Sequence, residues 1–81
     1  MALPTLDVCG LVERRLLAAG SKSEQRGLVL VADDGRVWTL RRVGGPAFGD
    51  AELAVLEGRR IQATARVRDR LLLLERWQVL A

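Results

Sequence analysis

The sequence predicts an all-β fold of five strands, with one short helix between the third and fourth strands. Two observations support this prediction. Apolar and polar residues alternate along most of the 81 residues, which is the pattern of half-buried strands. Glycine-containing turn signals separate the alternating stretches, and a chain of this length is expected to form a single domain over residues 1–81.

The first three strands are expected to follow one another as a meander over residues 6–19, 27–32 and 36–43. Gly10 interrupts the first strand, and a glycine inside a strand often marks a bulge or a sharp bend. The Asp-Asp-Gly sequence at 33–35 predicts a hairpin turn between the second and third strands, because glycine supplies the positive φ that such a turn needs.

A short helix is expected over residues 51–57. The side chain of Asp50 is suited to the N-cap, and Gly58 follows at the position that ends many helices. Leu53 and Leu56 are three residues apart, so one apolar stripe of this helix is predicted to face the core.

The fourth and fifth strands are expected over residues 59–68 and 71–80, joined by a tight turn. The fourth strand has the clearest alternation of the chain. Its apolar residues, predicted to face inward, are Ile61, Ala63, Ala65 and Val67. The polar residues between them are therefore predicted to face outward.

Three stretches carry a resemblance to a known fold: DDGRVWTL (33–40), LEGRRIQATARV (56–67) and RLLLLERWQV (70–79). With the order of the elements, they resemble small bacterial single-domain proteins of the OB-fold type, many of which have no assigned activity. The resemblance covers nearly the whole chain and implies a five-stranded OB-like Greek-key barrel. These stretches place strands and turns and match no ligand-binding signature, so the resemblance implies no particular function.

The composition excludes several kinds of chemistry. The chain has no His and one Cys, which leaves no intrachain disulfide, no His-dependent catalysis and few options for zinc. Its acidic residues are scattered, and the one adjacent pair belongs to the predicted hairpin turn. We therefore expect no catalytic residue, no metal and no cofactor, and the sequence predicts that the chain is not an enzyme.

The expected location is the cytoplasm. The longest apolar runs are far shorter than the roughly 20 residues of a membrane-spanning helix. Acidic and basic residues interrupt the first stretch of the chain, so no signal peptide and no membrane partner are expected.

Two predicted strands are apolar on both faces, at residues 28–31 and 71–74. A small barrel has a single interior, so one set of these side chains must face outward or be covered. The candidate interface residues are Val29, Val31, Leu71 and Leu73. The leading functional prediction is thus a non-enzymatic module for protein-protein interaction, either self-associating or an accessory subunit of a larger assembly.

Binding of single-stranded nucleic acid is the alternative prediction. The chain has 13 basic against 10 acidic residues, and Lys22 is the only basic residue that is not arginine. Alternate residues of a strand lie about 6.6–6.8 Å apart, which is comparable with the phosphate spacing of an extended single strand. The candidate contact residues are Arg41, Arg60, Arg66, Arg68, Trp38 and Trp77. Of the two tryptophans, Trp38 alternates with Leu40 in a pattern typical of the core.

Overall fold

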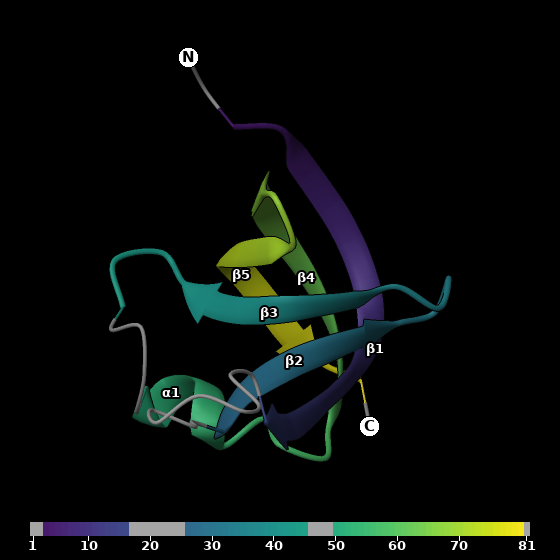
Figure 1. Ribbon diagram of the computed structural model, residues 1–81, viewed down its shortest axis with the longest axis vertical. Coiled ribbons are helices and arrows are strands. Elements are labelled where there is room, and N and C mark those ends of the chain that lie inside the picture. Colours follow the sequence, from purple (N-terminus) through teal and green to yellow (C-terminus); the bar gives the residue numbers. More distant parts are fainter. Residues whose placement is uncertain (1–2, 17–25, 46–49, 81) are drawn as a thin grey trace.

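The computed structural model describes residues 3–16, 26–45 and 50–80 of the chain. One five-stranded sheet forms most of this part, and one short helix precedes the fourth strand, as the sequence predicts. The elements are β1 (Thr5–Leu16), β2 (Arg26–Ala32), β3 (Val37–Arg42), α1 (Ala51–Ala54), β4 (Arg60–Arg68) and β5 (Leu71–Val79) (Figure 1).

Each strand pairs with two others, so the sheet closes on itself in the order β1-β2-β3-β5-β4. Four of the five strand pairs are antiparallel, and β3 pairs with β5 in parallel. A parallel pair needs a crossover connection, which α1 and β4 provide here. The result is that β5 begins beside the middle of β3, and the β4–β5 turn lies next to β3 as well.

The long, curved strand β1 belongs to two strand pairs in succession (Figure 1). Its residues from Thr5 to Leu11 pair with β4, and those from Gly10 to Leu16 pair with β2. A Cβ atom on Gly10 would lie 2.3 Å from the carbonyl oxygen of Val31. Glycine is therefore required where β1 changes from one partner to the other. The bulge considered from the sequence is absent there, because Gly10 pairs with Ala32 and with Ile61 without a shift of register in either described strand pair.

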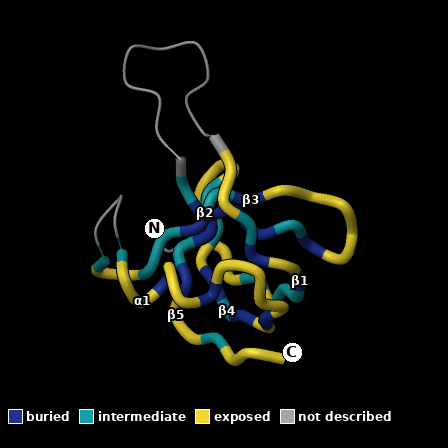
Figure 2. Tube along the Cα trace, turned by 90° about the horizontal axis from the view of Figure 1, so that it is seen from below, coloured by how far each residue is buried: buried dark blue, intermediate teal, exposed yellow. Residues whose placement is uncertain are grey.

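Inward-facing side chains of all five strands meet in one core, and buried and exposed residues alternate along the strands (Figure 2). The largest fully buried side chains are Leu30, Ile61, Leu72, Leu74 and Val12. Burying each such side chain stabilises the fold by about 1.5–3 kcal/mol. The alternation predicted for β4 is confirmed, because its apolar residues face this core and its polar residues lie on the outer side of the sheet.

Helix α1 is shorter than the sequence predicts and ends at Ala54. A tight turn follows, in which the N–H of Leu56 donates to the carbonyl oxygen of Leu53 at 2.9 Å. Gly58, predicted to end the helix, is the last residue of the turn instead, and its φ of 80° lies in the left-handed region that favours glycine. The predicted stripe is confirmed, since Leu53 and Leu56 are both buried, and Asp50 is the N-cap as predicted.

One residue of β5 is extra relative to its partner strand. The residues on either side of Glu75 pair with consecutive residues of β4, so Glu75 itself has no partner there. Such a bulge changes the side of the sheet on which all following residues lie. Trp77 therefore faces inward, opposite Ala63, and packs against the core, although unbroken alternation along β5 would place it outward.

Candidate functional site

The outer side of β4 carries three of the arginines that the sequence singles out, and two of them are paired with carboxylates. Arg60 contacts Asp33 of the β2–β3 turn, and Nε of Arg66 donates to Oε1 of Glu75 at 2.9 Å. Arg68 has no carboxylate partner in the described parts of the chain. The outer side of β4 is therefore interrupted by ion pairs and is not a continuous cationic stripe.

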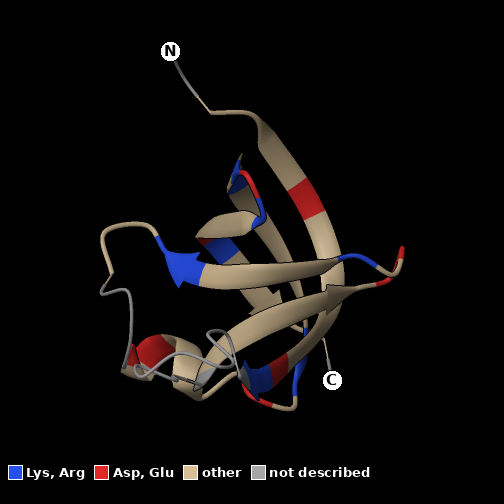
Figure 3. Cartoon of the chain, in the orientation of Figure 1, with Lys and Arg blue, Asp and Glu red and all other residues tan. Residues whose placement is uncertain are grey.

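Arg68 instead lines a cleft together with Arg41, which the sequence also singles out, and with Arg70. This open depression of about 400 Å³ lies between β3 and the β4–β5 turn, and we call it the arginine cleft. Its lining residues are Thr39, Arg41, Arg68, Asp69, Arg70 and Leu71. Figure 3 shows basic segments both at the end of β3 and at the β4–β5 turn.

The charge of the arginine cleft is strongly one-sided. Arg41, Arg68 and Arg70 form no ion pair with a carboxylate within residues 3–16, 26–45 and 50–80. Among the described residues of the lining, Asp69 is the only acidic one. The cleft thus presents three guanidinium groups, each a planar fork of donors that matches phosphate or carboxylate oxygens.

The register of the sheet explains why separate segments meet at the arginine cleft. Leu71 pairs with Thr39 of β3 on one side and with Arg68 of β4 on the other, so the three residues form one row. The carbonyl oxygen of Arg70 accepts a hydrogen bond from the N–H of Thr39 at 2.9 Å, which holds the turn against β3. Asp69 has a φ of 54°, a left-handed conformation that allows the short turn to reverse the chain.

A second depression, of about 360 Å³, continues past the same turn. Its lining residues are Arg36, Val37, Trp38, Asp69 and Arg70. The two depressions share Asp69 and Arg70 and both lie along β3, and we call them together the basic groove. From Arg36 to Arg41 it follows five residue steps, or about 17 Å of extended strand. A groove of this length and charge suits an extended anion.

Both tryptophans that the sequence offers for stacking face the core. Trp38 is only 9% exposed, and its indole Nε1 is buried without a hydrogen-bond acceptor in the described structure. The half-buried Trp77 lines a separate depression of about 290 Å³, which shares no residue with the basic groove. Phe48, the one other aromatic residue of the sequence, lies outside the described residues.

The four candidate interface residues are more covered than the sequence suggests. Val29 lies on the outer side of β2 between Glu13 and Thr39, yet it is only 3% exposed and offers no surface to a partner. The other three, Val31, Leu71 and Leu73, are half-buried. For Leu73 the neighbours across the sheet are arginines, whose long aliphatic stems can cover an apolar residue.

An exposed apolar row nevertheless crosses the outer side of three strands. Val31 of β2 pairs with Leu11 of β1 and with Val37 of β3, so these residues form one line across the sheet. Leu11 is 41% exposed and Val37 is 42% exposed. We call these three residues the apolar row, and Val37 also lines the basic groove.

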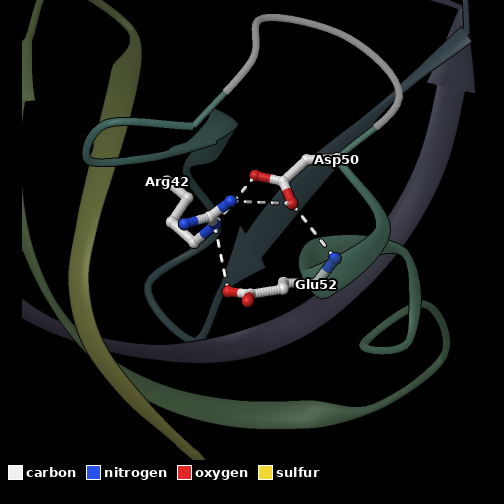
Figure 4. A network of polar contacts seen from close by, with 3 residues as sticks. All are labelled: Arg42, Asp50 and Glu52. Atoms are coloured by element: carbon white, nitrogen blue, oxygen red, sulfur yellow. Dashed lines mark hydrogen bonds and ion pairs between the residues drawn. The ribbon is translucent and has the colours of Figure 1, made fainter.

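A separate polar cluster, formed by Arg42, Asp50 and Glu52, connects the end of β3 to the start of α1 (Figure 4). Nε of Arg42 lies 3.0 Å from Oδ2 of Asp50 and 3.2 Å from Oε2 of Glu52. The side chain of Asp50 is 7% exposed, and its Oδ1 accepts the backbone N–H of Glu52 at 3.0 Å. We call this cluster the Arg42 brace.

Two opposing effects act on the pKa of Asp50. Burial alone would raise this pKa. The hydrogen bonds from Arg42 and from the backbone N–H of Glu52, with the charge of Arg42, outweigh that effect and hold the pKa below its ordinary value. Every member of the Arg42 brace is thus occupied by another, which is the arrangement of a structural cluster and leaves no group for a ligand.

Within the described residues, no group of three or more His, Cys, Asp or Glu side chains is placed to hold a metal ion. Nor does any described helix have the length and apolar character to cross a membrane.

Comparison with family models, with curated proteins and with solved structures gives no match for this chain. The basic groove and the apolar row are therefore interpreted from their own geometry.

Proposed function

We propose that this chain is a non-enzymatic module that binds single-stranded nucleic acid in the basic groove. The observation that carries this proposal is the meeting of Arg41, Arg68 and Arg70 at one cleft, without carboxylate partners in the described structure. Clustered cations repel one another in the free protein and attract a polyanion, whose condensed counterions are released on binding.

The type of fold belongs to the same proposal. The closed order β1-β2-β3-β5-β4, the parallel β3–β5 pair and the helix before β4 support an OB-like Greek-key barrel. Barrels of that type bind oligonucleotides or oligosaccharides on their second and third strands, beside the loop between the fourth and fifth. The basic groove lies at the corresponding place, along β3 and beside the β4–β5 turn.

Fluorescence anisotropy with a labelled oligothymidine tests this proposal. We expect a Kd of about 10⁻⁴–10⁻⁶ M at physiological salt, as for binding without sequence preference, and steep weakening as salt is raised. The double variant Arg68→Glu, Arg70→Glu should abolish binding because it reverses two of the three charges of the cleft.

The matched control is the double variant Arg59→Glu, Arg76→Glu. It makes the same change in net charge at two exposed arginines that line neither part of the basic groove and have no carboxylate partner in the described chain. Equal loss of binding in both double variants would contradict the proposal, since net charge rather than the groove would then attract the strand.

A second candidate function, protein-protein interaction, is favoured by the apolar row. An apolar line across three strands is a suitable centre for pairing with a second copy of the chain. Light scattering should then give the molar mass of a dimer that is insensitive to salt. Val37→Asp should yield a monomer, whereas Val55→Asp, on a residue that is 73% exposed after α1, should not. A wild-type monomer would rule out self-association through this row.

A further inference from the structure

We infer that the basic groove recognises a phosphate backbone alone and reads no base, so that an inorganic polyphosphate chain is as good a ligand as a nucleic-acid strand. The inference deepens the proposed function and rests on it. It follows from three features of the described structure: the position of the aromatic rings, the nature of the side chains along the groove, and the number of its cations.

The aromatic rings are turned away from the groove. Stacking of a base on an exposed aromatic ring typically strengthens single-strand binding by about tenfold or more per base. Trp38 lines the groove, but its ring belongs to the core and the residue is only 9% exposed. The bulge at Glu75 turns Trp77 inward, and the exposed part of Trp77 lines a depression elsewhere on β4 and β5.

The other side chains of the groove suit a backbone better than a base. Between the arginines lie Val37, Thr39 and Leu71, two aliphatic residues and one small hydroxyl. None of them offers the paired donor and acceptor with which an amide side chain reads the edge of a base. Thr39 is half-buried, and its hydroxyl can donate to one phosphate oxygen.

The cations of the groove are numerous enough to hold a short run of phosphates. Arg41, Arg68 and Arg70 surround one cleft, and Arg36, which precedes β3, follows about 17 Å along the chain from Arg41. Arg36 is shared with Asp34, because its Nε lies 3.7 Å from Oδ2 of that residue. Alternate positions along a strand repeat every 6.6–6.8 Å or so, which leaves room for about three phosphates. Phosphodiesters and polyphosphate both supply a row of singly charged phosphate groups, more closely spaced in polyphosphate, so we expect the groove to bind a strand that carries bases no more tightly than one without them.

The decisive experiment compares three ligands with a similar number of phosphate groups by anisotropy and competition. They are an oligothymidine of about eight nucleotides, an abasic oligomer with the same phosphodiester backbone, and an inorganic polyphosphate of about the same charge. We expect the three Kd values to agree within about threefold. The logarithm of the binding constant should fall with the logarithm of salt concentration at a slope of about −2 for the strands, because each of about three phosphates contributes roughly −0.7.

Substitution of single arginines by the neutral glutamine shows which residues bind the phosphate groups. Arg68→Gln and Arg70→Gln should each weaken all three ligands by a similar factor, about three- to tenfold at low salt, and reduce the slope by about 0.7. Arg59→Gln is the matched control, because Arg59 is an exposed arginine at the opposite end of β4 from Arg68. It should change neither the affinity nor the slope by a comparable amount.

The outcomes separate this inference from the proposed function. If the oligothymidine binds ten times or more tightly than the abasic oligomer, bases are read and the inference is overturned, while the proposed function stands. If polyphosphate binds and neither strand does, the proposed function fails, and the inference that the groove binds all three ligands alike fails with it. If none of the three ligands binds, or if the Arg68 and Arg70 variants behave like the Arg59 control, both are overturned.

Discussion

Arg41 and Arg42 are neighbours in β3, yet their guanidinium groups lie in opposite surroundings. Arg42 is on the side of β3 that carries Leu40, and it reaches Asp50 and Glu52 at the start of α1. Arg41 is on the outer side and lines the arginine cleft without a carboxylate partner in the described chain. The pleat of the strand, rather than the residue type, thus decides which arginine stabilises the fold and which one a ligand can reach.

The two regions also differ in how tightly they are built. In the Arg42 brace, Asp50 accepts hydrogen bonds both from Arg42 and from the backbone of α1. In the arginine cleft, the backbone is fixed by the hydrogen bond between Thr39 and Arg70, while the charged ends of the arginines have no ion-pair partner in the described structure. Changes in the first region should therefore lower stability, and changes in the second should alter binding.

The largest effect on stability is expected from Gly45→Ala. A Cβ atom at this position would lie 2.5 Å from Oδ2 of Asp50 and 3.1 Å from Cβ of Arg42, so the carboxylate must move away from its partner. We expect a loss of about 1–3 kcal/mol in the free energy of unfolding, measured in urea. In the Asp50→Ala background the same substitution should cost clearly less. An unchanged cost there would place the strain in the backbone of Arg42 instead.

Substitution of each neighbouring arginine by glutamine tests the comparison directly. Arg42→Gln should lower the Tm by several degrees and leave the oligothymidine affinity of the folded protein unchanged. Arg41→Gln should lower that affinity about three- to tenfold at low salt, while the Tm stays within about 2 °C of the wild type. Thermal unfolding and anisotropy on the same samples would show the crossed pattern. If both variants lose stability alike, Arg41 is structural and the comparison fails.

Acid should weaken the Arg42 brace at a predictable pH. The pKa of Asp50 in the fold lies below its ordinary value of 3.8, so its carboxylate stabilises the fold at every pH above that value. This stabilisation is lost as the pH falls through the lowered pKa. Asp50→Asn keeps an N-cap but no charge, so its Tm should approach that of the wild type below about pH 4. A constant difference between pH 6 and pH 2.5 or so would show that charge is unimportant there.

The smallest effect is expected from Asp69→Asn in the arginine cleft. Removing the only carboxylate among the described lining residues should strengthen oligothymidine binding by about two- to threefold at low salt, and less as salt is raised. Stability should be unchanged, because asparagine tolerates the left-handed φ of 54° at this turn. Weaker binding in this variant would mean that Asp69 positions the neighbouring arginines rather than repelling the ligand.

The strands and their order were predictable because the signals are local. Alternation in β4, the Asp-Asp-Gly turn and the cap at Asp50 all depend on residues close together in the chain, and each is confirmed. The end of α1 was not predictable, because the chain passes into a tight turn after Ala54 although no glycine or proline stands there. The direction of Trp77 was not predictable either, because the bulge at Glu75 depends on how β5 aligns with β4.

The candidate site was predictable only in part, because it depends on contacts between segments that are far apart in the chain. Arg41 and Arg68 stand out by their alternation in two strands, but only the parallel β3–β5 pair brings them together. That Arg60 and Arg66 are paired depends on contacts that no local pattern encodes. Alternation along the strands does not single out Arg70, because this residue lies in the β4–β5 turn. The Arg-Asp-Arg sequence at 68–70 could have indicated it, since it places an arginine on each side of Asp69.

Glu75, the bulge residue of β5, also affects the charge of the surface, because its carboxylate pairs with Arg66. Deleting Glu75 would leave β5 with regular alternation, since Leu74 and Arg76 already pair with consecutive residues of β4 and Trp77 would still face Ala63. The same deletion would remove the carboxylate that pairs with Arg66, whose cross-strand neighbour Leu73 lies beside Arg41. The loss of one codon would thus add a cation next to the cleft without changing which side chains form the core. The length of this strand, as well as its composition, sets the charge that the surface presents.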